Sequence, residues 1–254
     1  MVAVVLAAGR GTRMGALTAT TPKPLLPVAG RPIIEHILGG FAAAGVRRAV
    51  VVIGHLADAF EAALGDGTRL GLEIIYCRQE HAEGTARALL LAEPLLGAGP
   101  FAVSWGDILV RPQFYADFVR AFADRPCDAQ VAVNPVDDPW RGAAVYVDDD
   151  WRVHRVEEKP PRGTATTRWN NAGILMLTPQ VFSFARRLSA SPRGEYELPQ
   201  AVAQMVRDGC SVRAVPVRGP WSDVGTPDDL AAAQALFATP ARAARRGGAA
   251  GGTP

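Results

Sequence analysis

Hydrophobic residues occur along this chain in short blocks with two different periodicities. In the first half, continuous apolar blocks of strand length alternate with segments of helical periodicity. The predicted strands are residues 2–8, 49–53, 72–76 and 101–104, and the predicted helices are residues 33–44, 56–64 and 86–91. This order predicts an α/β fold in which helices cover a parallel or mixed sheet.

From residue 128 onward the predicted strands are shorter and alternate in polarity. We expect an antiparallel arrangement for residues 130–134, 143–147 and 152–157, with Asp148-Asp149-Asp150 as the turn between the last two. Further strands are predicted at 174–177 and 212–217, and helices at 197–208 and 228–237. Residues 9–32, rich in Gly, Thr and Pro, are predicted to form an exposed loop, and residues 238–254 a disordered tail.

Composition excludes several classes of protein. The net charge of +2 comes from three tail arginines, because residues 1–237 hold 24 basic and 25 acidic residues, so the pI near 8.6 does not indicate nucleic-acid binding. Three widely spaced cysteines fit neither a disulfide framework nor a zinc ribbon. No apolar run is long enough to span a membrane, and the apolar start continues into a glycine loop unlike a signal peptide. We expect a cytoplasmic protein with no nucleic-acid or membrane partner.

The loop after the first strand carries the first chemical motif. It contains Gly9-Arg10-Gly11-Thr12-Arg13 and later Pro22-Lys23-Pro24. Glycines allow backbone N–H groups to approach phosphate oxygens closely, while Arg13 and Lys23 can supply positive charge. The loop lacks the Gly-Lys-Ser/Thr of a Walker A motif, and Met14 stands where a dinucleotide fingerprint needs its third glycine. On the glycines alone, an ordinary strand-to-loop turn explains the pattern equally well.

Lysine is scarce, since Lys23 and Lys159 are the only two lysines among 27 basic residues. The other basic residues are arginines, which carry a planar guanidinium. A compact ammonium group is therefore expected to matter at the two lysine positions.

Six segments together resemble the sugar-1-phosphate nucleotidyltransferases, and the resemblance extends over nearly the whole chain. They are residues 6–27, residues 79–86, Gly106-Asp107, Glu157-Glu158-Lys159-Pro160, Asn171-Ala172-Gly173 and residues 221–226. The resemblance implies a Rossmann-like three-layer sandwich with a mostly parallel mixed sheet and a smaller antiparallel sugar-binding part. It also implies one nucleotidyltransferase domain at 1–237, with a nucleotide-binding half at 1–127 and a sugar-phosphate-binding half at 128–237. A homo-oligomer is possible, because members of the family often form dimers or tetramers.

The resemblance also assigns roles to residues. Those implied for the nucleotide are Leu6, Ala8, Gly9, Gly11, Thr12, Gln79, Gly84 and Thr85, with Arg13 and Lys23 as the catalytic pair at the triphosphate. Those implied for the sugar phosphate are Gly142, Glu157, Lys159 and Asn171. Asp107 and Asp223 would hold Mg²⁺ as the cofactor. Both lysines fall in positions where the family pattern places a lysine.

The implied reaction joins a nucleoside triphosphate to a sugar 1-phosphate and releases pyrophosphate. Two anions must meet, so neutralisation of charge matters more than a general base, and no Ser, Cys or His nucleophile is required. Gln79 with residues 84–86, and the run at residues 194–198, resemble enzymes that use UTP or dTTP, and a gluco-configured sugar is favoured. A guanylyltransferase for mannose, heptose or cyclitol phosphates stays open, because Glu80 can accept from guanine.

Two other classes of protein are alternatives. A glycosyltransferase would need an Asp-x-Asp metal motif, which Asp148-Asp149-Asp150 could imitate, although a hairpin turn explains these residues better. A non-catalytic nucleotide-binding partner should have lost a lysine or a metal carboxylate, and this chain retains Lys23, Lys159, Asp107 and Asp223. Trp105 is left open between core packing and the wall of a pocket.

Overall fold

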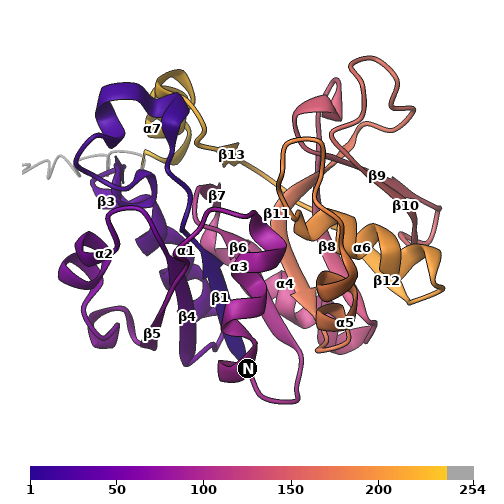
Figure 1. Cartoon of the computed structure of the whole chain (residues 1–254), viewed down its shortest axis with the longest axis horizontal. Coiled ribbons are helices and arrows are strands. Elements are labelled where there is room, and N and C mark those ends of the chain that lie inside the picture. Colours follow the sequence, from indigo (N-terminus) through magenta and orange to yellow (C-terminus); the bar gives the residue numbers. More distant parts are fainter. Residues whose placement is uncertain (239–254) are drawn as a thin grey trace, which may run out of the picture.

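A central mixed sheet with helices on both faces forms the body of the protein (Figure 1). The computed structural model describes residues 1–238, and residues 239–254 of the predicted tail lie outside the described residues. The strands of the main sheet are β1 (Val2–Leu6), β4 (Arg48–Ile53), β5 (Glu73–Arg78), β6 (Phe101–Trp105), β8 (Ala129–Pro135), β9 (Ala143–Val147), β10 (Val153–Glu158), β11 (Trp169–Leu177) and β12 (Val212–Pro216). The helices are α1 (Ile33–Ala43), α2 (Ala57–Leu64), α3 (Thr85–Ala92), α4 (Pro112–Asp124), α5 (Val181–Arg187), α6 (Leu198–Arg207) and α7 (Pro227–Phe237).

The three-layer sandwich predicted from the sequence is confirmed. Along β1, Ala3 and Val5 belong to one hydrophobic core with α1 and α4, while Val4 and Leu6 belong to a second core with α3, α5 and α6. A strand covered on both faces needs apolar residues at every position, which explains its continuous apolar block. β1, β4, β5 and β6 are parallel to one another, and their carboxyl ends therefore meet at one edge of the sheet.

Antiparallel strands extend the sheet beyond β6. The main path is β10-β9-β11-β6-β1-β4-β5, and β8 pairs with both β11 and β12. The hairpin of β9 and β10 is confirmed, and the Asp148 carboxylate accepts from the N–H groups of Asp150 and Arg152 at 3.0 and 2.8 Å, as expected of a turn. The strand predicted at 130–134 does not join this hairpin, because β8 runs antiparallel to β11 and parallel to β12.

Several elements lie where none was predicted. α4 buries Phe114, Tyr115, Phe118 and Phe122 against the sheet, a helical spacing that the sequence does display. α5 is also additional, as is a ribbon of β7 (Ile108–Val110) and β13 (Trp221–Asp223). The loop at 9–32 contains the 3₁₀ helices Thr12–Thr18 and Lys23–Leu25, followed by the short strands β2 (Pro27–Val28) and β3 (Arg31–Pro32).

α7 packs against this loop from the other end of the chain. Its N-cap Thr226 accepts from the Asp229 N–H at 3.2 Å. Farther along α7, the Gln234 side chain accepts from the Ala29 N–H at 2.8 Å and donates to the Pro27 carbonyl at 2.7 Å. One amide side chain therefore pairs with the backbone of β2 and of the turn that follows it.

Candidate active site

Most of the sequence-predicted nucleotide residues lie at the carboxyl edge of the parallel strands. The loop after β1 contains Gly9, Gly11 and Arg13. Gln79 directly follows β5, and Asp107 lies just after β6. In Figure 1 the first residue is at the lower edge, and the indigo loop after β1 lies at the upper edge with α7. Ligands of open α/β sheets bind at this edge, so the topology brings these segments to a position where a site can form.

Lys23 and Asp107 form an ion pair at this edge, from positions 84 residues apart in the chain. The Lys23 side chain is 11% exposed and that of Asp107 is 21% exposed. Pro22 and Pro24 on either side of Lys23 are also buried. The expectation that Lys23 lies on an exposed loop is therefore wrong, because the prolines and the ion pair draw this part of the loop into the protein.

Asp223 joins this pair through the ribbon of β7 and β13. Asp223 is in register with Ile108, and the N–H of Val224 donates to the Asp107 carbonyl at 3.0 Å. Reduced solvation, followed by repulsion from Asp107, raises the pKa of Asp223 to about 7, while Lys23 and Arg13 act in the opposite direction. Asp223 is still accessible to solvent, so the surrounding protein weakens its hydration without excluding water. Two neighbouring carboxylates of this kind form a local concentration of negative charge.

Arg13 lies over the backbone of Gly225, two residues after Asp223. A Cβ atom at Gly225 would lie 2.9 Å from Nη2, 3.0 Å from Nη1 and 3.1 Å from Cζ of Arg13. These distances are shorter than normal van der Waals contacts, so the arginine occupies its position only because residue 225 has no side chain. The sequence motif identified Gly225 as part of a pattern but not as the support of Arg13.

The glycines of the first loop differ in their surroundings. Gly11 has φ +63°, and a Cβ there would lie 3.1 Å from Cβ of Lys23, so Gly11 and Lys23 are in direct contact. Nothing lies within 4 Å of the corresponding position at Gly9, which is exposed together with Thr12. The backbone at Gly9 is therefore open to a ligand. The Leu6 carbonyl, in contrast, accepts from the Gly106 N–H at 2.9 Å and joins β1 to the loop that carries Asp107.

A pocket of about 200 Å³ opens beside this loop. Its lining includes the predicted nucleotide residues Ala8 and Gln79, and it also includes Gly54, His55 and Arg10, which the sequence did not indicate. The Gln79 amide donates to the Gly84 carbonyl at 3.4 Å, so the two residues implied in reading the base are adjacent. Trp105 packs, partly buried, against both hydrophobic cores and does not line this pocket.

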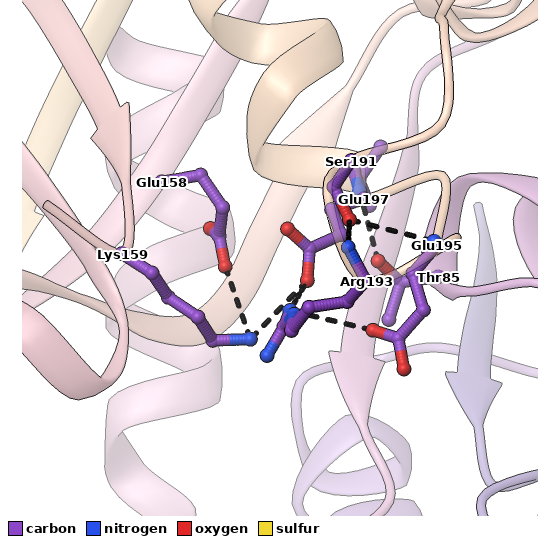
Figure 2. Close-up of polar contacts among 8 residues, drawn as sticks. Thr85, Glu158, Lys159, Ser191, Arg193, Glu195 and Glu197 are labelled. Carbon is purple, nitrogen blue, oxygen red and sulfur yellow. Dashed lines mark hydrogen bonds and ion pairs between the residues drawn. The ribbon is translucent and has the colours of Figure 1, made fainter.

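Lys159 is placed by an unusual backbone conformation at the end of β10. Its φ of +45° is rare for a residue other than glycine, and its N–H donates to the Gly142 carbonyl at 2.8 Å. Its Nζ lies 3.4 Å from Glu158 and 3.2 Å from Glu197 (Figure 2). Burial lowers the pKa of Lys159, with the Glu158 charge acting in the opposite direction, and burial likewise raises the pKa of Glu158.

The other predicted sugar-side residues are held by local contacts. Arg155 donates to Glu157 at 2.6 Å, and Asn171 accepts through its side chain from the Gly173 N–H at 2.9 Å. Gly142 has no room for a side chain, because a Cβ there would lie 2.2 Å from Oδ1 of Asn170. Gly142 therefore packs directly against the buried side chain of Asn170.

Comparison with known proteins finds relatives over most of the chain. Residues 2–239 match the family model described as nucleotidyl transferase. The chain is 34% identical over 232 residues to a glucose-1-phosphate thymidylyltransferase of Streptomyces antibioticus, covering 91% of this chain and 64% of the relative, so it spans less than two thirds of that protein. It is 32% identical to the UTP–glucose-1-phosphate uridylyltransferase of Haloferax volcanii, covering 90% of this chain and 93% of the relative.

A solved structure leads to the same conclusion. The crystal structure of a putative glucose-1-phosphate thymidylyltransferase from Bacillus anthracis superposes with a TM-score of 0.84 at 28% identity, covering 93% of this chain and 95% of that one. The fold is thus that of the nucleotidyltransferases, with a Rossmann-like sheet. The chain belongs to the nucleotidyl transferase family, as the sequence motifs predicted. Within residues 1–238, none of the helices has the length and apolar character needed to cross a membrane.

Proposed function

We propose that this protein is a sugar-1-phosphate nucleotidyltransferase that joins a nucleoside triphosphate to a sugar 1-phosphate and releases pyrophosphate. The observation that carries the proposal is the pairing of Lys23 with Asp107 beside Asp223 at the carboxyl edge of the sheet. Two carboxylates and a buried ammonium group are suited to a polyphosphate and a divalent cation. Family membership supports the same reaction.

The residues of the site are suited to each requirement of this reaction. A phosphate oxygen of the sugar 1-phosphate forms a bond to the α-phosphorus, and the bond from that phosphorus to the bridging oxygen of pyrophosphate breaks. No proton must move, because the nucleophile is already anionic, so the residues act by neutralising charge and orienting the two phosphates. We assign Arg13 and Lys23 to the triphosphate and Lys159 to the sugar phosphate. Gln79 and Gly84 are assigned to the base, and Glu157 and Asn171 to the sugar hydroxyls.

Asp107 and Asp223 fit a magnesium ion. Among residues 1–238, no group of three or more His, Cys, Asp or Glu side chains is arranged for a metal, so this pair would supply two ligands. Mg²⁺ commonly takes one or two carboxylates and completes its shell with water and phosphate oxygens. When bound, it would neutralise charge on the carboxylates and the phosphates. Lys23, no longer needed to neutralise Asp107, would then be available to the triphosphate.

UTP and dTTP are the favoured nucleotides. The support is Gln79 beside Gly84, which can exchange hydrogen bonds with a pyrimidine edge, and relatives named for thymidylyl and uridylyl transfer to glucose 1-phosphate. The test is release of pyrophosphate with Mg²⁺ across ATP, GTP, CTP, UTP and dTTP, each combined with glucose, mannose and heptose 1-phosphates. Release that requires both substrates, and that is fastest with UTP or dTTP, is expected. Fastest release with GTP would favour the guanylyltransferase alternative, and no release would contradict the proposed reaction.

Replacing either carboxylate should raise the requirement for Mg²⁺. With Asp107→Asn or Asp223→Asn we expect the half-saturating Mg²⁺ concentration to rise by about ten-fold or more, because a neutral amide is a weaker ligand than a carboxylate. The measurement is initial rate against Mg²⁺ concentration. Asp149→Asn is the matched control, since Asp149 is exposed in the turn between β9 and β10. Equal magnesium titrations for all three variants would contradict the assignment.

A further inference from the structure

The segment at residues 191–198 connects the nucleotide side of the site to the sugar side. The N–H of Tyr196 donates to the Glu83 carbonyl, and the carbonyl of Tyr196 accepts from the Ala86 N–H, both at 2.8 Å. Gly84 has φ +103°, and a Cβ there would lie 2.6 to 3.0 Å from backbone atoms of Tyr196. The base-reading loop at 79–86 and this segment are therefore in direct backbone contact.

Side-chain contacts also join the loop at 79–86 and α3 to the segment at 191–198. The guanidinium of Arg87 lies 4.2 Å from the centre of the Tyr196 ring, a cation–π contact between α3 and the segment. The Thr85 hydroxyl accepts from the N–H of Leu198 at 2.8 Å. Leu198 is the first residue of α6, where backbone N–H groups have no partner inside the helix.

The side chain of the N-cap residue of α6 accepts no hydrogen bond from the N–H groups at the start of the helix. Glu197 stands at the N-cap and makes no side-chain capping bond. Its buried carboxylate instead contacts Lys159 at 3.2 Å and also pairs with Arg193. In Figure 2, the Lys159 and Arg193 side chains approach this carboxylate from different segments. Thr85, the first residue of α3, bonds to the first residue of α6. The Thr85 hydroxyl thus caps α6 from a different helix. The Glu197 carboxylate does not cap α6, and it contacts Lys159 instead.

We infer that Thr85 is a positioning residue for the sugar phosphate, through the start of α6 and the Glu197 carboxylate that holds Lys159. This inference rests on the proposed function, and it changes the role that the sequence motif implies for Thr85. The hydroxyl already has a partner 113 residues away in the sequence. The side chain therefore acts on the sugar side, although its backbone belongs to the loop that is assigned to the base.

The test compares Thr85→Val, which keeps the shape and removes the hydroxyl acceptor, with Thr85→Ser, which retains it. In Thr85→Val we expect the KM for glucose 1-phosphate to rise about five-fold. The free energy usually lost with a helix cap corresponds to a change of about two- to thirty-fold. The KM for dTTP should change less than about two-fold. Thr85→Ser should restore the KM for glucose 1-phosphate. Thr85→Ala provides the same loss of the hydroxyl if the valine variant does not fold.

A double-mutant cycle tests whether Thr85 acts through Glu197. In a Glu197→Gln background, Thr85→Val should change the KM for glucose 1-phosphate by less than about two-fold, because the carboxylate that it positions is already lost. A larger rise in the KM for dTTP than for glucose 1-phosphate, or equal effects of valine and serine, would overturn the inference. Wild-type release of pyrophosphate is measured first, so that failure of the proposed function is recognised separately. In that case, calorimetric titration of glucose 1-phosphate into the same variants tests the inference without turnover.

Discussion

Lys23→Ala is expected to lower kcat by about 10²- to 10³-fold, the usual effect of removing one preorganised charge from a transition state. The variant loses the ammonium group assigned to the triphosphate. It also leaves Asp107 without its ion-pair partner, beside an Asp223 carboxylate that already titrates near neutral pH. Because Lys23 is buried, we expect a Tm lower by a few degrees in addition to slow turnover.

Lys23→Arg is the matched control for charge. It keeps the positive charge but places a planar guanidinium, larger than the ammonium group, against the Asp107 carboxylate in a largely buried position. We expect it to recover only part of the lost rate. Rates are measured by pyrophosphate release and the fold by circular dichroism. A wild-type rate in the alanine variant would contradict the role of Lys23, and a wild-type rate in the arginine variant would contradict the need for an ammonium group.

Gly225→Ala is expected to lower kcat/KM for the nucleoside triphosphate by about 10²-fold while leaving the fold intact. The new methyl group would occupy space that now belongs to the Arg13 guanidinium, at 2.9 to 3.1 Å. A flexible arginine can move away at little cost in stability, but it then leaves the position from which it would contact a phosphate. Gly225 does not have the positive φ that only glycine adopts easily, so alanine introduces no backbone strain.

Arg13→Ala completes a cycle that identifies the cause. If Gly225 acts by supporting Arg13, Gly225→Ala should have little further effect once the arginine is absent. Gly99→Ala is the control substitution, since nothing lies within 4 Å of a Cβ there and its φ is also not positive. Additive losses in the double variant, measured from steady-state rates at varied triphosphate concentration, would show that Gly225 acts independently of Arg13.

Patterns of apolar residues predicted the architecture well in segments that are buried. β1 reads as a continuous apolar block because Ala3 and Val4 face different cores, and this pattern correctly predicted a sheet covered by helices. α4 was missed although Phe114 and Phe118 have helical spacing and Pro112 stands in its first turn. The ribbon of β7 and β13 could not be predicted, since three-residue strands carry too little periodicity.

For the candidate site, prediction from the sequence was limited in a different way. Motifs identified which residues to bring together, and Gln79 does lie beside Gly84 and Asp107 beside Lys23. The motifs did not show that the Thr85 hydroxyl bonds to the backbone of α6. That contact depends on packing between segments more than a hundred residues apart, which no local pattern records.

Gln234 implies an order of events during synthesis. Its amide pairs with the backbone of Ala29 across a separation of 205 residues. At about 5–20 residues per second, roughly 10–40 seconds pass on the ribosome between the two residues. During that interval the nascent chain holds the loop at 9–32 without α7, which contacts Thr12–Thr18 and β2. The loop assigned to the triphosphate is therefore made long before the helix that packs on it.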